Sequence, residues 1–148
     1  MTGMRYVAIL LLVIVARAEK APMSPAALKK VATQVVVGDV VAIYTRETKE
    51  GRWKYTRYCA EVKVTAVEKG TDAKVGDLVY ARYWQRRWAS LGVPPPSTSG
   101  HRGLPAEGDT LRIYLARNAY DGFTKDNNDG GFNVIGANGF ERFKKPTK

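Results

Sequence analysis

Cysteine and histidine are almost absent from this chain of 148 residues, which has one of each. The single cysteine, Cys59, excludes an intrachain disulfide, so packing alone must hold the fold. The single histidine, His101, excludes a metal centre built on several histidines. There is also no G-x-S-x-G motif, phosphate-binding glycine loop or dinucleotide fingerprint. We therefore expect a protein that is not an enzyme, with no catalytic residue, metal or cofactor.

Long hydrophobic runs are equally scarce. The only long one is VAILLLVIV at residues 7–15, and the basic Arg5 precedes it. It covers about half of the roughly 20 residues that a helix needs to cross a bilayer. A positive start followed by a short apolar core is typical of a secretory signal peptide. The run is too short for a permanent membrane anchor, and no second apolar segment follows it.

Small residues end this segment at the two positions that matter for cleavage. Ala16 and Ala18 form an A-x-A pattern directly before Glu19. The sequence therefore predicts a signal peptide over residues 1–18, a mature chain that begins at Glu19, and a secreted or periplasmic product. Removal of the leader leaves about 130 residues, which is the size of a single domain.

Acidic residues are outnumbered in this chain. It has 24 Lys and Arg against 14 Asp and Glu, a net charge of +10. Only Arg5 and Arg17 of the basic residues lie in the predicted leader. This balance favours acidic partners, among them nucleic acid, anionic glycans and phosphate-bearing wall polymers. It also keeps many exported proteins soluble, so charge alone does not choose a partner.

The mature chain is rich in β-branched and alternating apolar residues. Ser24 followed by Pro25 is a typical helix start, and predicts a short helix over residues 25–33. Gly38, inside a long β-branched segment, indicates a bulge or bend that lets one strand serve two sheets. Alternation of apolar and polar residues from 58 to 66 predicts one buried strand face. The predicted strands are 34–45, 53–67, 77–84, 110–115 and 132–135.

Five strands, with a long and bent first strand, predict a mainly β fold. We expect a five-stranded OB-like barrel with a short N-terminal helix, and a small β-sandwich is the alternative. A charged turn is expected at residues 46–52. The expected organisation is a polar leader at 19–24, a single domain at 25–143 with a long loop at 85–109, and a flexible basic tail at 144–148.

A resemblance to a known group of domains follows the same order of segments. Exported OB-like domains of the netrin and TIMP kind (NTR-like) resemble this chain over residues 31–143 in pattern and turn placement. The resemblance implies a barrel scaffold and a binding role. Those domains usually have disulfides, which a chain with one cysteine cannot form. TIMP proteins inhibit metalloproteinases through an N-terminal cysteine, whereas the predicted mature chain begins at Glu19, so this inhibitory mechanism does not carry over. The matching segments are VVVGDVVAIY, YCAEVKVTAVEKG, VGDLVYARYW, LPAEGDTLRIYLA and GFNVIGANGF.

Aromatic and basic residues interleave on the second and third predicted strands. Arginine forks bind phosphate or carboxylate, and exposed Trp and Tyr stack on bases or sugar faces. OB barrels bind ligands across these two strands. Aromatic residues are also common in barrel cores, with Arg stems packed along their rims, so a structural role is the alternative. The candidate ligand-binding residues are Trp53, Tyr55, Arg57, Arg82, Trp84, Arg86, Arg87 and Trp88.

Three other groups carry weaker signals. Ser97, Ser99 and His101 resemble a nucleophile and a base, but a flexible loop lacks the support that catalysis needs, so we expect a solvated loop. Cys59 has basic neighbours that would activate a thiol, whereas burial under the N-terminal helix is the interpretation we favour. Segment 121–130 is rich in Asp and Asn, but lacks the EF-hand order and is interpreted as a turn.

These observations predict a non-catalytic exported binding module that holds an acidic or glycan-like partner on the basic and aromatic residues. The alternative is a protein-interaction or inhibitor domain that presents loop 92–103 to another exported protein. The pattern leaves open the identity of the polyanion (glycan, wall polymer or nucleic acid) and the oligomeric state.

The intact mass of the exported chain tests the signal peptide. We expect a mature product whose mass corresponds to a chain starting at Glu19. Ala18→Phe should block cleavage, because the position before the cut requires a small side chain, and should leave the leader attached. A wild-type product that starts far from Glu19 would contradict the prediction.

Overall fold

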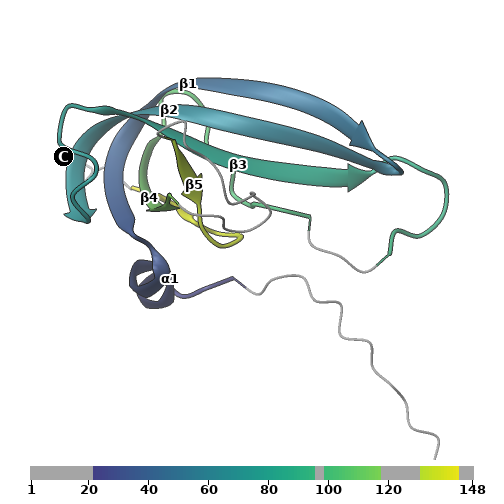
Figure 1. Ribbon diagram of the computed structural model, residues 1–148, viewed down its shortest axis with the longest axis horizontal. Helices are drawn as coiled ribbons and strands as arrows, with labels where there is room; N and C mark the ends of the chain where they lie inside the picture. Colours follow the sequence, from purple (N-terminus) through teal and green to yellow (C-terminus); the bar gives the residue numbers. More distant parts are fainter. Residues whose placement is uncertain (1–21, 96–98, 118–130, 144–148) are drawn as a thin grey trace, which may run out of the picture.

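The computed structural model describes residues 22–95, 99–117 and 131–143. The predicted signal peptide with its cleavage site at Ala16, Ala18 and Glu19, the segment 121–130 and the tail 144–148 lie outside these ranges. The protein is mainly β with one short helix, as predicted. Its elements are α1 (Pro25–Val31), β1 (Gln34–Glu50), β2 (Trp53–Lys69), β3 (Leu78–Trp88), β4 (Thr110–Ala116), β5 (Phe132–Val134) and β6 (Phe140–Arg142), shown in Figure 1.

Helix α1 begins where the sequence predicts. The Ser24 side chain accepts a hydrogen bond from the Ala27 N–H, and Pro25 occupies the first turn. The helix ends at Val31, two residues earlier than predicted, because Ala32 is extended and the Thr33 N–H donates to the Leu115 carbonyl in the sheet. No helix in the described part of the chain is long and apolar enough to cross a membrane.

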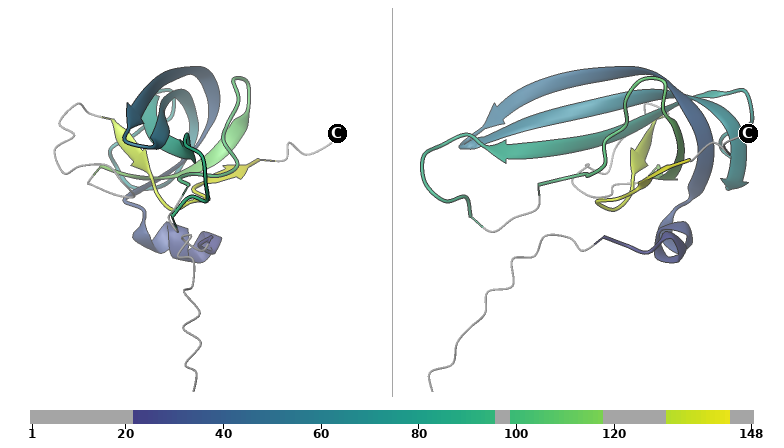
Figure 2. Two further views of the ribbon diagram at one scale, coloured as in Figure 1. Left: turned by 90° about the vertical axis from the view of Figure 1, so that its right-hand side faces the viewer. Right: turned by 180° about the vertical axis from the view of Figure 1, so that it is seen from behind.

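The strands form one ring-like sheet. Its order is β1-β2-β3-β5-β4, and a further pairing between β1 and β4 closes the ring. Neighbouring strands are antiparallel except for β3 and β5, which are parallel. The left view of Figure 2 shows the strands curling around this ring. The predicted OB-like arrangement is therefore confirmed at the level of a ring of five strands, and β6, which pairs with β4, is an element that the sequence prediction missed.

Strand β1 bends at the predicted glycine. Its first six residues, 34–39, pair with β4 on one edge, and β2 pairs along the other edge. The β1–β2 register shifts between Val37 and Gly38, as expected for a bulge. A Cβ at Gly38 would lie 2.5 Å from the carbonyl oxygen of Lys63. The missing side chain therefore lets the two strands approach closely at the bend.

The ring encloses an apolar core. Ala60, Val62 and Val64 of β2 are buried, which confirms the predicted alternation. Tyr83 of β3 stacks on Tyr58 with ring centroids 4.8 Å apart. Burial raises the pKa of the Tyr83 phenol well above its usual value. Buried residues of the other strands, among them Val36, Leu111, Ile113, Phe132 and Phe140, complete the core.

Strands β1, β2 and β3 continue past the ring as an arm, which we define as residues 41–61 and 80–88. The arm overlaps the ring at Ala81 and Arg82, which pair with β5. In Figure 1 the arm projects away from the end of the molecule that carries α1. Strand β1 continues to Glu50, so the predicted charged turn at 46–52 is wrong, and the turn lies at Gly51 and Arg52. Strand β3 continues to Trp88, so the predicted loop 85–109 begins only after that residue. Continuous pairing along β2 extends both strands.

Replacing Gly38 with alanine tests the close approach at the bend. The new methyl group would meet the Lys63 carbonyl and Val62, so the strands must move apart. We expect Gly38→Ala to lower the free energy of unfolding by about 1–3 kcal/mol, as overpacking does, in urea denaturation followed by circular dichroism.

Gly51→Asn is the matched control for this prediction. Gly51 has a left-handed φ of 61°, which Asn tolerates, and no atom lies within 4 Å of the site of its Cβ. Its stability should stay close to that of the wild type. Equal losses in the two variants would contradict the role given to Gly38.

Candidate functional site

The two faces of the arm carry different side chains. Residues that face each other across an antiparallel pair share a face, and successive residues alternate between faces. Tyr58 pairs with Tyr83, and these residues face the core. The opposite face holds the pairs Trp53–Trp88, Tyr55–Arg86, Arg57–Trp84 and Cys59–Arg82.

Seven of the eight candidate residues therefore lie together. We name them the basic–aromatic face: Trp53, Tyr55, Arg57, Arg82, Trp84, Arg86 and Trp88. The eighth, Arg87, pairs with Lys54 on the other face of the arm, because it follows Arg86 directly in the strand. Arg87 is exposed there. The structure thus separates two adjacent arginines that the sequence prediction had grouped.

Arg86 lies at the centre of the aromatic cluster. Its guanidinium lies 4.4 Å from the centre of the Trp53 ring and 5.7 Å from that of Tyr55. It also donates a hydrogen bond of 2.8 Å to the Tyr55 hydroxyl. Trp88 meets Trp53 edge to face, with ring centroids 5.0 Å apart. Cation–π and edge contacts hold these side chains in fixed positions.

The aromatic residues differ in accessibility. Trp84 is 8% exposed and packs between Tyr55 and the His101 ring. Trp53, Tyr55 and Trp88 are half-buried, and each keeps part of its ring surface accessible. The indole N–H of Trp88 has no hydrogen-bond partner among the described residues. Trp84 therefore supports the face, whereas the other three rings are available for contact.

Positive charge is concentrated on the arm. Arg57 binds Glu50 at 2.9 Å and Thr48 at 2.7 Å, and Lys54 binds Glu47 at 2.6 Å. These are the only two acidic residues from position 44 to 57, a segment with five basic residues. The exposed side chains Arg46, Lys49, Arg52 and Arg87 have no ion pair within the described ranges.

His101 is buried, which corrects the prediction of a solvated loop. It is 2% exposed. Its Nε2 lies 2.9 Å from the carbonyl oxygen of Val134, and its Nδ1 lies 3.3 Å from the backbone nitrogen of Trp84. Residues 99–101 run along β3, where the His101 N–H donates to the Trp84 carbonyl. His101 thus anchors the returning loop, while Ser97 lies outside the described residues.

Cys59 is half-buried on the face opposite the core, between Tyr44 of β1 and Arg82 of β3 in register. The predicted cover by the N-terminal helix is wrong, because α1 packs at the other end of the sheet, against Val35 and Tyr114. Tyr44 donates a hydrogen bond to Glu61, and that bond raises the pKa of the Tyr44 hydroxyl.

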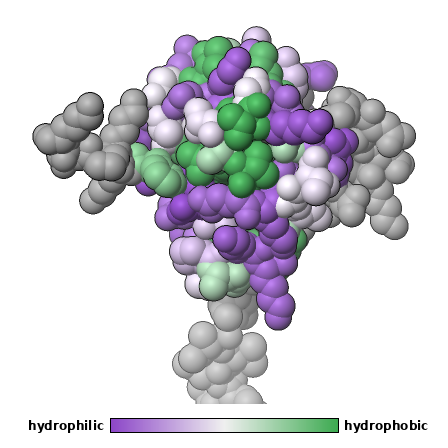
Figure 3. All heavy atoms as spheres, turned by 90° about the vertical axis from the view of Figure 1, so that its left-hand side faces the viewer, coloured by the Kyte–Doolittle hydropathy of each residue, from purple (hydrophilic) through white to green (hydrophobic). Residues whose placement is uncertain are grey.

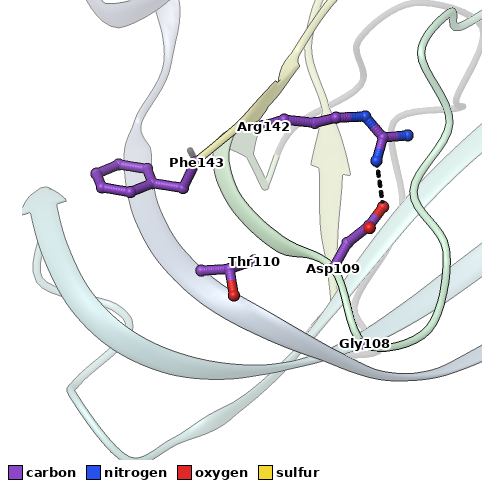
Figure 4. Close-up of a pocket in the computed structure, with 5 residues that line it drawn as sticks. All are labelled: Gly108, Asp109, Thr110, Arg142 and Phe143. Carbon is purple, nitrogen blue, oxygen red and sulfur yellow. Dashed lines mark hydrogen bonds and ion pairs between the residues drawn. The ribbon is translucent and has the colours of Figure 1, made fainter. Parts of the chain in front are cut away.

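A shallow hollow of about 320 Å³ lies outside the arm, between the start of β4 and the end of β6 (Figure 4). Its charged groups already serve the fold: Arg142 binds Asp109 at 2.7 Å and donates to the Leu104 carbonyl. Asp109 also accepts from the Ala106 N–H. The charged groups that line the hollow make structural contacts, so the hollow is a weaker candidate for a ligand site than the arm.

The rest of the described surface offers no stronger candidate site than the arm. At the end of the molecule opposite the arm, a small apolar area lies among hydrophilic side chains (Figure 3). Within the part of the chain that the structure describes, no three His, Cys, Asp or Glu side chains come close enough to hold a metal ion.

No family model matches this chain, and no curated protein or solved structure matches it.

Substitution of His101 tests its anchoring role. Removing the ring leaves a cavity and two backbone groups without their partner, so we expect His101→Ala to lower the free energy of unfolding by about 2–4 kcal/mol. Urea denaturation measures the loss. Leu91→Ala is the control, because Leu91 is 97% exposed and its truncation should change stability very little. A His101→Ala variant as stable as this control would refute the anchoring role.

Proposed function

We propose that this protein is a non-catalytic binding module that holds an acidic, glycan-like polymer on the basic–aromatic face of the arm. The observation that carries the proposal is the gathering of three half-buried aromatic residues and three arginines on one sheet face, with Arg86 stacked over Trp53. Half-exposed rings of this kind stack on sugar faces, and arginine forks bind carboxylate or sulfate groups.

The surrounding charge supports the same partner. The exposed cations of the arm, Arg46, Lys49, Arg52 and Arg87, raise the local positive potential and attract a polyanion. Ligand binding across the second and third strands is common in OB-like sheets. The NTR-like resemblance and the predicted signal peptide support the proposal that the module acts outside the cytoplasm, in a periplasm or cell exterior.

A salt-stepped binding panel tests this function. The mature protein is applied to columns of sulfated glycan, DNA and acidic wall polymer, and binding is also followed by tryptophan fluorescence. All three tryptophans of the chain lie on the basic–aromatic face, so a bound polymer should change the emission. We expect the sulfated glycan to bind at low salt and to dissociate as salt rises.

Two double variants with the same change in charge identify the binding face. Arg57→Gln with Arg86→Gln should weaken glycan binding about tenfold or more and reduce its salt dependence by about two ionic contacts. Lys30→Gln with Lys74→Gln, on exposed positions outside the arm, should have a much smaller effect. Equal losses in both variants, or no binding to any column at low salt, would refute the proposal. Tighter binding to DNA or to wall polymer would identify a different polyanion.

One observation favours the second candidate function, a protein-interaction domain that uses loop 92–103. Leu91, directly before this loop, and Val93, near its start, are 97% and 80% exposed. Its return is fixed by Gly100 and His101, which are buried against β3. Leu91→Ser with Val93→Ser should leave polymer binding intact and would abolish capture of a protein partner.

A further inference from the structure

Among the described residues, no strand lies beside the outer edge of the arm. Strand β1 pairs with β4 only through residues 34–39, and from there to Glu50 it pairs with β2 alone. Figure 1 shows β1 as the outermost strand of the arm. The Ile43 N–H donates to the Glu107 carboxylate, so it points away from β2. By alternation, the backbone groups of Thr45, Glu47 and Lys49 also point outward.

The charge pattern along this edge is complementary to that of a second, antiparallel copy of the same strand. Residues 46–50 read Arg-Glu-Thr-Lys-Glu. In an antiparallel pair of two such strands centred on Thr48, Arg46 faces Glu50 of the second copy, and Glu47 faces Lys49 of the second copy. Because Glu47 and Lys49 both point their backbone groups outward, they also form the hydrogen-bonded pair of the ladder.

Neighbouring registers are disfavoured by charge. Moving the centre to Glu47 sets two glutamates against each other, and moving it to Lys49 sets two lysines against each other. Like charges directly opposite in a sheet are destabilising. Charged edge strands resist indiscriminate pairing for this reason. The charge pattern therefore favours the register centred on Thr48 over those centred on Glu47 and Lys49.

The single chain also has like charges that a second copy would offset. Arg46 lies opposite Arg57, and Lys49 lies opposite Lys54, in the β1–β2 register. Within the described residues, neither Arg46 nor Lys49 has an ion pair. Pairing with a second β1 would place Glu50 beside Arg46 and Glu47 beside Lys49. Within one chain Glu47 binds Lys54 and Glu50 binds Arg57, so the glutamates of a second copy would be the first acidic partners of Arg46 and Lys49.

We infer that two copies of this chain associate through antiparallel pairing of their β1 edges, centred on Thr48. The contact has two-fold symmetry, so each ion pair occurs twice. Facing residues share a face of the sheet, and the two basic–aromatic faces therefore lie on the same side of the combined arm. This association does not depend on the proposed ligand. The interface is one strand wide, and so the dimer dissociates on dilution.

Sedimentation velocity of the mature chain from micromolar to millimolar concentration tests this inference. We expect a monomer–dimer equilibrium in the wild type. Lys49→Glu removes the repulsion with Lys54 inside the chain, so the fold is retained, but it sets two carboxylates against each other across the edge. Its dissociation constant should rise about tenfold or more, as expected for like charges opposed at two symmetric positions. Arg46→Glu should act in the same way against Glu50.

Charge exchange gives the decisive result. Glu47→Lys with Lys49→Glu reverses both partners of each ion pair and leaves Lys54 one acidic neighbour, so it should restore dimerisation. Lys74→Glu, the same charge change at an exposed position in the β2–β3 connection, should have no effect. Thermal melts check that each variant is folded. A wild type that stays monomeric, a folded Lys49→Glu that still dimerises fully, or a folded charge-exchange variant that stays monomeric would each overturn the inference.

Discussion

Strand β1 pairs with a strand on both of its edges for its first six residues, and with β2 alone for the rest. This change of neighbours follows Asp39, directly after the bend at Gly38, where the absence of a side chain lets the backbone of β1 approach Lys63. The ring closes because β1 pairs with β4 up to and through the bend. The arm exists only because β1 continues with β2 after it. Both the core and the candidate site therefore depend on one bent strand.

Beyond the ring, the arm is stabilised differently from the core. A three-stranded ribbon has little interior, and its inner face near the tip carries charged residues such as Lys54 and Arg87. Stacking on the opposite face compensates for this. Arg86 connects Trp53 and Tyr55, and Trp88 covers the edge of Trp53. The residues proposed to bind a polymer thus also hold the arm together.

The sequence predicted features that depend on local patterns. The apolar alternation of β2, the helix start at Ser24 and the bend at Gly38 were correct because each follows from neighbouring residues. Seven of the eight candidate residues share one face of the arm and Arg87 does not. The predicted strand boundaries were too short to show which face each residue takes. The burial of His101 could not be predicted, because its partners, Trp84 and Val134, are distant in sequence.

The same geometry governs how the molecule opens. Because the hydrogen bonds at the tip of the arm are separate from those that close the ring, the strands can unzip from Gly51 as far as Arg46 while the core stays buried. Local opening of this kind costs less free energy than global unfolding. Backbone amides near Gly51 would then exchange with deuterium faster than those beside Val36 and Val62. The protein therefore combines a rigid base with an end that adapts its shape.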